Sequence, residues 1–204
     1  MSKSLEVSLD VSLERAQPEL MTAVHIASLG FAREESTELA LDVENHLVSG
    51  KIVYRIFVNN CEAGFAIFAT YGDILYLSGI IIIPKFQGQG VIKYVFDEVR
   101  ASHPECRYLA LRTQSLRMYL AAKKLCVECY PCLDKTSVIP KAFAKRGRLI
   151  AKKIQSQFPI HVGFYGGPLY GQKPVYGNPE LQKDWDELCN FERGDAIIFI
   201  GSLA

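Results

Sequence analysis

Two glycines, Gly88 and Gly90, lie between a strongly apolar segment and an amphipathic one. Glycine lets the backbone bend sharply at such a point and lets a ligand approach the main chain closely. The first N–H groups of a following helix have no partner inside the helix and lie at the positive end of its dipole. This spacing therefore predicts a phosphate or diphosphate site, with a tight strand-to-helix turn as the plainer alternative.

The segments on either side are the ones that such a loop requires. Residues 74–83 form an apolar run of strand length that ends in four consecutive isoleucines. Residues 90–100 carry Val91, Val95 and Val99 four positions apart, which predicts one apolar stripe on a helix. Because several nucleotide-binding designs share this strand–loop–helix order, the loop sequence itself must separate them.

The loop departs from two widespread phosphate-binding patterns. A dinucleotide fingerprint requires a third glycine where this chain has Lys93, and a P-loop requires a Gly-Lys-Ser/Thr ending that the loop lacks. The segment from Gln87 to Ile92 instead resembles the acetyl-CoA loop of the GCN5-related N-acetyltransferases, the GNAT superfamily. Gln87, Gly88 and Gly90 fit that pattern, whereas Ile92 stands where the superfamily prefers glycine or alanine.

The resemblance implies a fold class and a co-substrate. We expect an α/β (α+β) domain whose mixed, mostly antiparallel central sheet is flanked by helices and split at the acyl-CoA site. Acetyl-CoA would place its diphosphate on backbone N–H groups of the loop and pair its pantetheine amides with the splayed strand. The residues assigned in this way are Ile80, Ile81, Ile82, Gln87, Gly88, Gln89, Gly90, Val91, Ile92 and Gln114.

The order of the expected elements is that of the same superfamily. Besides the segments around the loop, strands are expected at 5–11, 51–58, 61–70, 107–112 and 126–130, and helices at 34–48, at 115–125 and after Gln17-Pro18-Glu19. We treat residues 1–204 as a single GNAT-like domain, with a core over 5–132 and a C-terminal extension over 133–204.

The extension is expected to carry a basic helix, a loop and a final strand. Residues 135–153 hold seven Lys or Arg and no acid, which suits a solvated helix face or attraction for an acidic acceptor, RNA or the CoA phosphates. Residues 163–179 are rich in glycine and proline, so we expect a long loop there. Tyr165, Tyr170 and Tyr176 would either line an acceptor pocket or pack on one another. Residues 195–203 would add the last strand of the sheet.

Acyl transfer needs an acid for the leaving thiolate and a base for the attacking amine. The resemblance assigns the acid to Tyr119, in the helix expected at 115–125; ordinary core packing is the alternative. Many relatives carry a glutamate on the loop strand, but the matching positions here are Tyr76 and Ser78. The base is therefore left open among Asp73, Glu128, His161 and water.

The composition excludes several classes of function. A net charge of +1 argues against nucleic-acid binding by the whole chain. The polar start is no signal peptide and the apolar runs are too short to span a membrane, so we expect a cytoplasmic protein with reduced thiols. Cys126, Cys129 and Cys132 are spaced for a metal or simply for a strand; because structural zinc needs four ligands, we expect no metal.

We therefore expect an N-acetyltransferase that moves an acetyl group from acetyl-CoA directly to an amine. The acceptor would be a small molecule or a peptide, and a homodimer is compatible with the fold. Two alternatives stay open. One is a non-catalytic acyl-CoA-binding or sensing module. The other is a protein-interaction module whose glycine–tyrosine loop and basic helix bind a partner.

Overall fold

A computed structural model describes residues 9–133 and 138–203 of the chain. One mixed sheet carries all the strands within these residues. The elements follow in this order: β1 (Val11–Glu14), α1 (Leu20–Phe31), α2 (Thr37–Ser49), β2 (Ile52–Val58), β3 (Cys61–Tyr71), β4 (Ile74–Ile82), a 3₁₀ turn (Pro84–Phe86), α3 (Val91–Ala101), β5 (Tyr108–Thr113), α4 (Leu116–Lys123), β6 (Cys126–Tyr130), α5 (Lys141–Lys153), β7 (Ile160–His161), α6 (Pro179–Leu188) and β8 (Ala196–Leu203).

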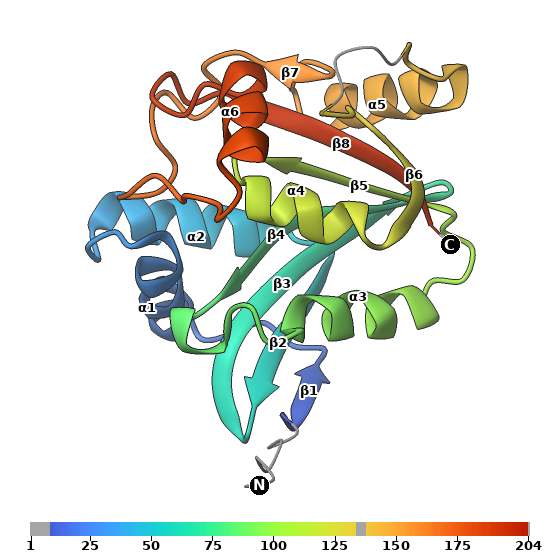
Figure 1. Cartoon of the computed structure of the whole chain (residues 1–204). Helices are drawn as coiled ribbons and strands as arrows, with labels where there is room; N and C mark the ends of the chain where they lie inside the picture. Colours follow the sequence, from blue (N-terminus) through green and yellow to red (C-terminus); the bar gives the residue numbers. More distant parts are fainter. Residues whose placement is uncertain (1–8, 134–137, 204) are drawn as a thin grey trace, which may run out of the picture.

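The strands lie in the order β1-β2-β3-β4-β5-β8-β6, and β7 pairs with β8 (Figure 1). Neighbours are antiparallel except β4 and β5, which are parallel. The expected α/β class with a mixed, mostly antiparallel sheet is thus confirmed. The last strand of the chain is not at the edge of the sheet, because β8 separates β5 from β6. The extension after residue 133 therefore supplies part of the main sheet.

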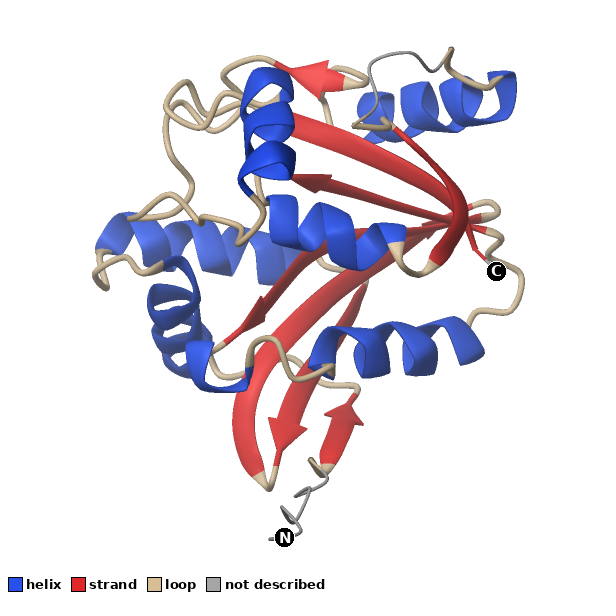
Figure 2. Ribbon diagram, viewed as in Figure 1, coloured by secondary structure: helices blue, strands red, loops and turns tan. Residues whose placement is uncertain are grey.

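Helices cover both faces of the sheet (Figure 2). Helices α3, α4 and α6 share the largest apolar cluster, which lies on the face in front in this view. Helices α1 and α2 pack on the opposite face over β2, β3 and β4, and α5 packs there over β8. The alternation along β8 shows the two faces: Ile197 and Phe199 join the first cluster, Ile198 and Ile200 the cluster under α5.

Most expected elements lie within a few residues of the observed ones. The first strand expected at 5–11 lies mostly outside the described residues, because residues 1–8 are not described, and the described strand β1 covers Val11–Glu14. Helix α6 was not expected at all. Asn178 starts it by accepting hydrogen bonds from the Glu180 and Leu181 N–H groups, with Pro179 at its first position.

The sheet opens between β4 and β5. These two strands pair only over Ile74–Leu77 and Tyr108–Leu111, and beyond that they diverge (Figure 1). At the same level the β3–β4 register shifts between Ile67 and Phe68, so that Ser78 has no partner opposite it. An extra residue of this kind bends a strand and leaves its own backbone groups outside the ladder. The bulge at Ser78 thus coincides with the start of the split.

Candidate active site

A cavity of about 360 Å³ lies at the split between β4 and β5. Its floor is the bulged part of β4, and its other walls come from β5, from α1 and α2, from α4 and from the loop that precedes α6. Cavities of this size suit small-molecule ligands. Segments that are far apart in the sequence therefore meet at the point where the sheet opens.

The free edge of β4 can pair with an extended ligand. The Ile83 N–H donates to the Ala63 carbonyl of β3, 2.9 Å away. Because an antiparallel ladder alternates, Ile81 also directs its backbone groups toward β3, while Ile80 and Ile82 direct theirs toward the split. Backbone contacts are thus available at Ile80 and at the N–H group of Ile82, whose carbonyl accepts from the Gln87 side chain. They are not available at Ile81, which instead lines the cavity and packs its side chain against Gly30.

The glycine loop has the conformation that its sequence predicts. Gly88 and Gly90 adopt positive φ angles of 75° and 84°, which favour glycine over other residues. A Cβ atom at either position would meet no described atom within 4 Å, so the space above the loop is open. No described side chain caps α3, and its first turn carries no acid. Val91, Ile92 and the residues around them therefore present free N–H groups that fit a diphosphate.

Three side chains of the loop are engaged within the protein. The Gln87 amide donates to the Ile82 carbonyl at 2.7 Å, which ties the loop to the end of β4. The Gln89 amide donates to the Lys85 carbonyl at 2.6 Å. Ile92 is half-buried and packs against the main core. These residues shape the loop with their side chains, and their contact with CoA remains a prediction.

The side chain of Gln114 forms hydrogen bonds with the C-terminal segment. It is buried, and its amide donates to the carbonyls of Phe191 and Asp195 at 3.1 and 3.3 Å. Its carbonyl oxygen accepts from the Leu169 N–H at 3.0 Å. With both amide hydrogens and the oxygen occupied, the side chain has little to offer a cofactor. The geometry thus counts against the predicted CoA contact and gives Gln114 a structural role.

Tyr119 lies inside the core. Its side chain has no exposed surface, and its ring packs against Trp185 and Phe199 with centroids 5.2 and 5.6 Å apart. Its hydroxyl donates to the Pro131 carbonyl at 2.8 Å. Tyr119 does not line the cavity, so this packing counts against its predicted role as the acid.

The α2 wall supplies an acid–base pair that the sequence reasoning missed. Nδ1 of His46 lies 2.8 Å from the Asp42 carbonyl oxygen and 3.5 Å from the Asp42 carboxylate. A proton on Nδ1 satisfies these acceptors and leaves Nε2 free to accept another. The bond to Asp42 raises the pKa of His46, and the same contact lowers the pKa of the carboxyl. The sequence feature that could have revealed this pair is the i, i+4 spacing of Asp42 and His46 within the helix expected at 34–48.

The loop before α6 forms the remaining wall. Tyr165 and Tyr170 line the cavity, as one of the two sequence interpretations expected, whereas Tyr176 packs against the main core. The Tyr170 ring contacts Phe31 at the end of α1, with centroids 5.4 Å apart, and its side chain interacts with Ser115 at the start of α4. Burial raises the pKa of the Tyr170 hydroxyl to about 12.

The bases considered from the sequence lie elsewhere. Asp73, in the β3–β4 turn, pairs with Arg146 at 2.5 Å and with Arg107 at 3.2 Å. Glu128 is exposed on β6. Nδ1 of His161 lies 3.0 Å from the Ser156 hydroxyl oxygen. None of these three candidates lines the cavity at the split.

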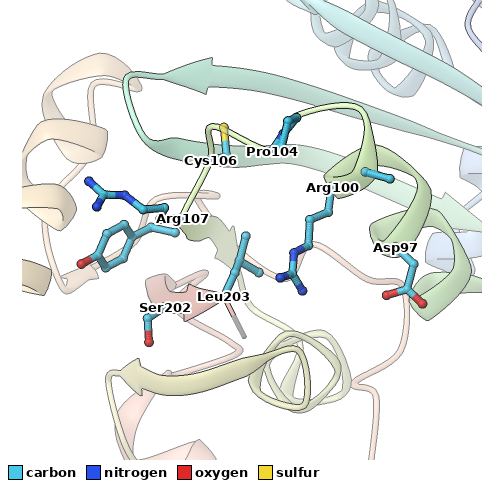
Figure 3. A pocket seen from close by; sticks show the side chains of 9 residues that line it. Asp97, Arg100, Pro104, Cys106, Arg107, Ser202 and Leu203 are labelled. Atoms are coloured by element: carbon cyan, nitrogen blue, oxygen red, sulfur yellow. The ribbon is translucent and has the colours of Figure 1, made fainter.

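A second hollow, of about 620 Å³, lies at the far end of α3 (Figure 3). It is bordered by Arg100, Cys106 and Arg107 and by the end of β8. Although larger, it is shallow and open, and it touches neither the split nor the glycine loop.

Among the described residues, no group of His, Cys, Asp or Glu is arranged to hold a metal. Helices long and apolar enough to cross a membrane are likewise absent from the described part.

Comparison with solved structures identifies the fold. The chain is similar to the ribosomal-protein-S18-alanine N-acetyltransferase of Escherichia coli, with a TM-score of 0.54, 15% identity and coverage of 96% of this chain and 95% of that one. It is also similar to a GNAT family acetyltransferase from Elizabethkingia anophelis with acetyl-CoA bound, with a TM-score of 0.50, 16% identity and coverage of 97% and 100%.

A third similar structure is an IAA acetyltransferase from Bacillus cereus, with a TM-score of 0.50, 14% identity and coverage of 95% and 100%. No protein-family model matches the sequence, and no curated protein matches it either. The chain thus has the fold of the GNAT acetyltransferases, as the glycine loop led us to expect. At this identity the likeness establishes the fold alone.

Proposed function

We propose that this protein is an acyl-CoA-dependent N-acetyltransferase that transfers an acetyl group directly from acetyl-CoA to an amine. The observation that carries the proposal is the meeting of two features at the split. The free, bulged edge of β4 ends at an uncapped helix terminus on one side, and it borders a cavity with a histidine base on the other.

The β4 edge and the glycine loop would hold the co-substrate. The backbone of Ile80 and the N–H group of Ile82 can pair with the pantetheine amides, as in the addition of a strand to a sheet. The N–H groups from Gly90 to Ile92 bind the diphosphate. This path brings the thioester to the bulge at Ser78, where a backbone N–H outside the ladder can polarise the carbonyl.

His46 would act as the general base. The amine nitrogen forms a bond to the thioester carbon and gives a proton to Nε2, while Asp42 holds Nδ1 and stabilises the imidazolium that forms. An imidazole whose pKa is raised above its ordinary value is a suitable acceptor near neutral pH.

Tyr170 is our candidate for the acid in place of Tyr119. As the carbon–sulfur bond breaks, the thiolate needs a proton, and Tyr170 lies in the cavity wall close to the start of α4. A tyrosine hydroxyl is protonated at neutral pH, so a proton is available there. The hydroxyl is then restored from solvent or from the protonated base.

The test combines calorimetric titration of CoA with a thiol-release assay using acetyl-CoA and a panel of amines, amino acids, peptides and polyamines. We expect CoA binding and thiol release with at least one acceptor, and mass spectrometry should show one added acetyl group per thiol released. Tight CoA binding without thiol release from any acceptor would favour the acyl-CoA-binding module instead. Absence of CoA binding would contradict both.

A further inference from the structure

Arg112 occupies the cavity in an environment unusual for an arginine. It follows Leu111, the last residue of β5 that pairs with β4, and therefore projects where the sheet has opened. Its guanidinium carbon lies 3.6 Å from the centroid of the Phe164 ring and 5.9 Å from that of Tyr165. Stacking of this kind fixes the plane of the guanidinium and leaves its N–H groups at the edge.

The charge on Arg112 has no carboxylate partner among the described residues. Other half-buried arginines do: Arg55 pairs with Glu62 at 2.7 Å, and Arg146 pairs with Asp73 at 2.5 Å. Nε of Arg112 is buried and has no hydrogen-bond partner among the described residues. A buried donor without a partner is costly, and a guanidinium prefers two parallel bonds to a carboxylate or phosphate. The guanidinium also hydrogen-bonds the Tyr165 hydroxyl, which is neutral and does not balance its charge. This side chain is therefore arranged to receive an anion.

Helix α2 carries the complementary charge. Asp42 and His46 line the same cavity from α2, and Arg112 is near enough to lower the pKa of both groups electrostatically. Much of the remaining lining is apolar, with Phe31 and Phe65 among its residues. The cavity thus presents a cation, a carboxylate–imidazole pair and apolar surface to one ligand.

We propose that the acceptor is a small amine that carries a carboxylate near its reacting nitrogen, and that Arg112 binds this carboxylate. The inference rests on the proposed acetyltransferase function and names its substrate class. An acceptor anchored on Arg112 turns its amine toward His46, and its apolar side chain contacts the aromatic lining. A free α-amino acid with an apolar side chain has this arrangement of groups.

Matched acceptors test the inference. Phenylalanine and leucine would each be compared with the corresponding carboxamide and with the amine that lacks the carboxyl group, in the thiol-release assay with acetyl-CoA. We expect kcat/KM for the free acids to exceed that for both analogues by about 10- to 100-fold, the range that a buried charge-assisted pair contributes. A phosphonate analogue shows whether the site accepts any anionic oxygen group or a carboxylate alone.

Arg112→Gln removes the charge and keeps a planar polar group. We expect it to remove the preference for the acids, with little change for the carboxamides. Arg148→Gln, at an exposed position on α5, is the matched control and should leave all rates unchanged. Thermal unfolding and CoA titration verify that both variants fold and bind the co-substrate.

The outcomes separate the two proposals. Thiol release with amides and amines at the same efficiency as with the acids, or an equal loss for all acceptors in Arg112→Gln, overturns the carboxylate site and leaves the acetyltransferase standing. Thiol release from none of these compounds or of the wider panel overturns the acetyltransferase, and the carboxylate site with it.

Discussion

The two sides of the split differ in how their residues come together. On the cofactor side, the β4 edge and the glycine loop lie within one stretch of the chain, from Ile80 to Ile92. On the acceptor side, Asp42, Arg112 and Tyr170 come from a helix, a strand and a loop far apart in the sequence. The first group offers backbone atoms from one local segment, and such a segment can keep its conformation with many different side chains. The second is an assembly of side chains, which we propose selects the acceptor.

The largest effect is expected from the base on the acceptor side. His46→Gln should lower kcat by about 10²–10⁴-fold, because general acid–base groups typically contribute that much. The affinity for CoA should not change, since α2 lies apart from the glycine loop. The control is His25→Gln, an exposed histidine on α1 that pairs with Glu35. Full activity in His46→Gln would assign the proton to water.

A pair of tyrosine variants compares the acid inferred from the structure with the one expected from the sequence. Tyr170→Phe should lower kcat by about 10²-fold, the lower end of the range for a proton donor. Tyr119→Phe should keep its activity and lose about 1 kcal/mol of unfolding free energy, because one buried hydrogen bond disappears. Steady-state kinetics and urea unfolding measure these effects. The reverse pattern would restore Tyr119 as the acid.

On the cofactor side, Gly90→Val should weaken CoA binding by about 10- to 100-fold, as expected for losing charge-assisted hydrogen bonds to the diphosphate. Gly72→Val is the matched control, because Gly72 also has a positive φ and open space around its Cβ position but lies in the β3–β4 turn. Calorimetry compares the two. An equal CoA affinity in a folded Gly90→Val protein would place the diphosphate elsewhere.

The smallest effect is a shift in pH dependence. His46 must be unprotonated to act as a base, so kcat/KM should fall as the pH drops through the pKa of His46. Asp42 raises that pKa above its ordinary value of 6.5. Asp42→Asn should therefore move the acidic limb of the profile to lower pH, with only a few-fold change on the plateau. An unshifted limb would mean that another group controls it.

The glycine loop was the part of the site that the sequence could predict, because its signal is local. Positive φ at Gly88 and Gly90, the strand before them and the helix after them depend on residues a few positions apart. The structure counts against the sequence assignment where a residue has two possible environments. Tyr119 fits an active-site helix as well as a core, and the burial that decides between them comes from Trp185 and Phe199, distant in the sequence.

Gln114 shows the same limit in another form. Its position after β5 suggests a cofactor contact, yet its amide is taken up by the carbonyls of Phe191 and Asp195. Those partners lie in a segment whose helix α6 was not expected. An amide side chain has the same hydrogen-bonding capacity in either place, so the sequence alone cannot assign it.

The sequence by itself determined most of the succession of strands and helices up to β6, the glycine turn and the helix terminus that follows it, because hydrophobic periodicity and backbone freedom act over a few residues. Only the tertiary structure decided that β8 enters between β5 and β6, that the sheet opens at Ser78, and that Asp42, His46, Arg112 and Tyr170 face one cavity. These arrangements depend on strand pairing and on packing between segments far apart in the chain. The spacing of residues within any one segment does not indicate which distant segment it will contact.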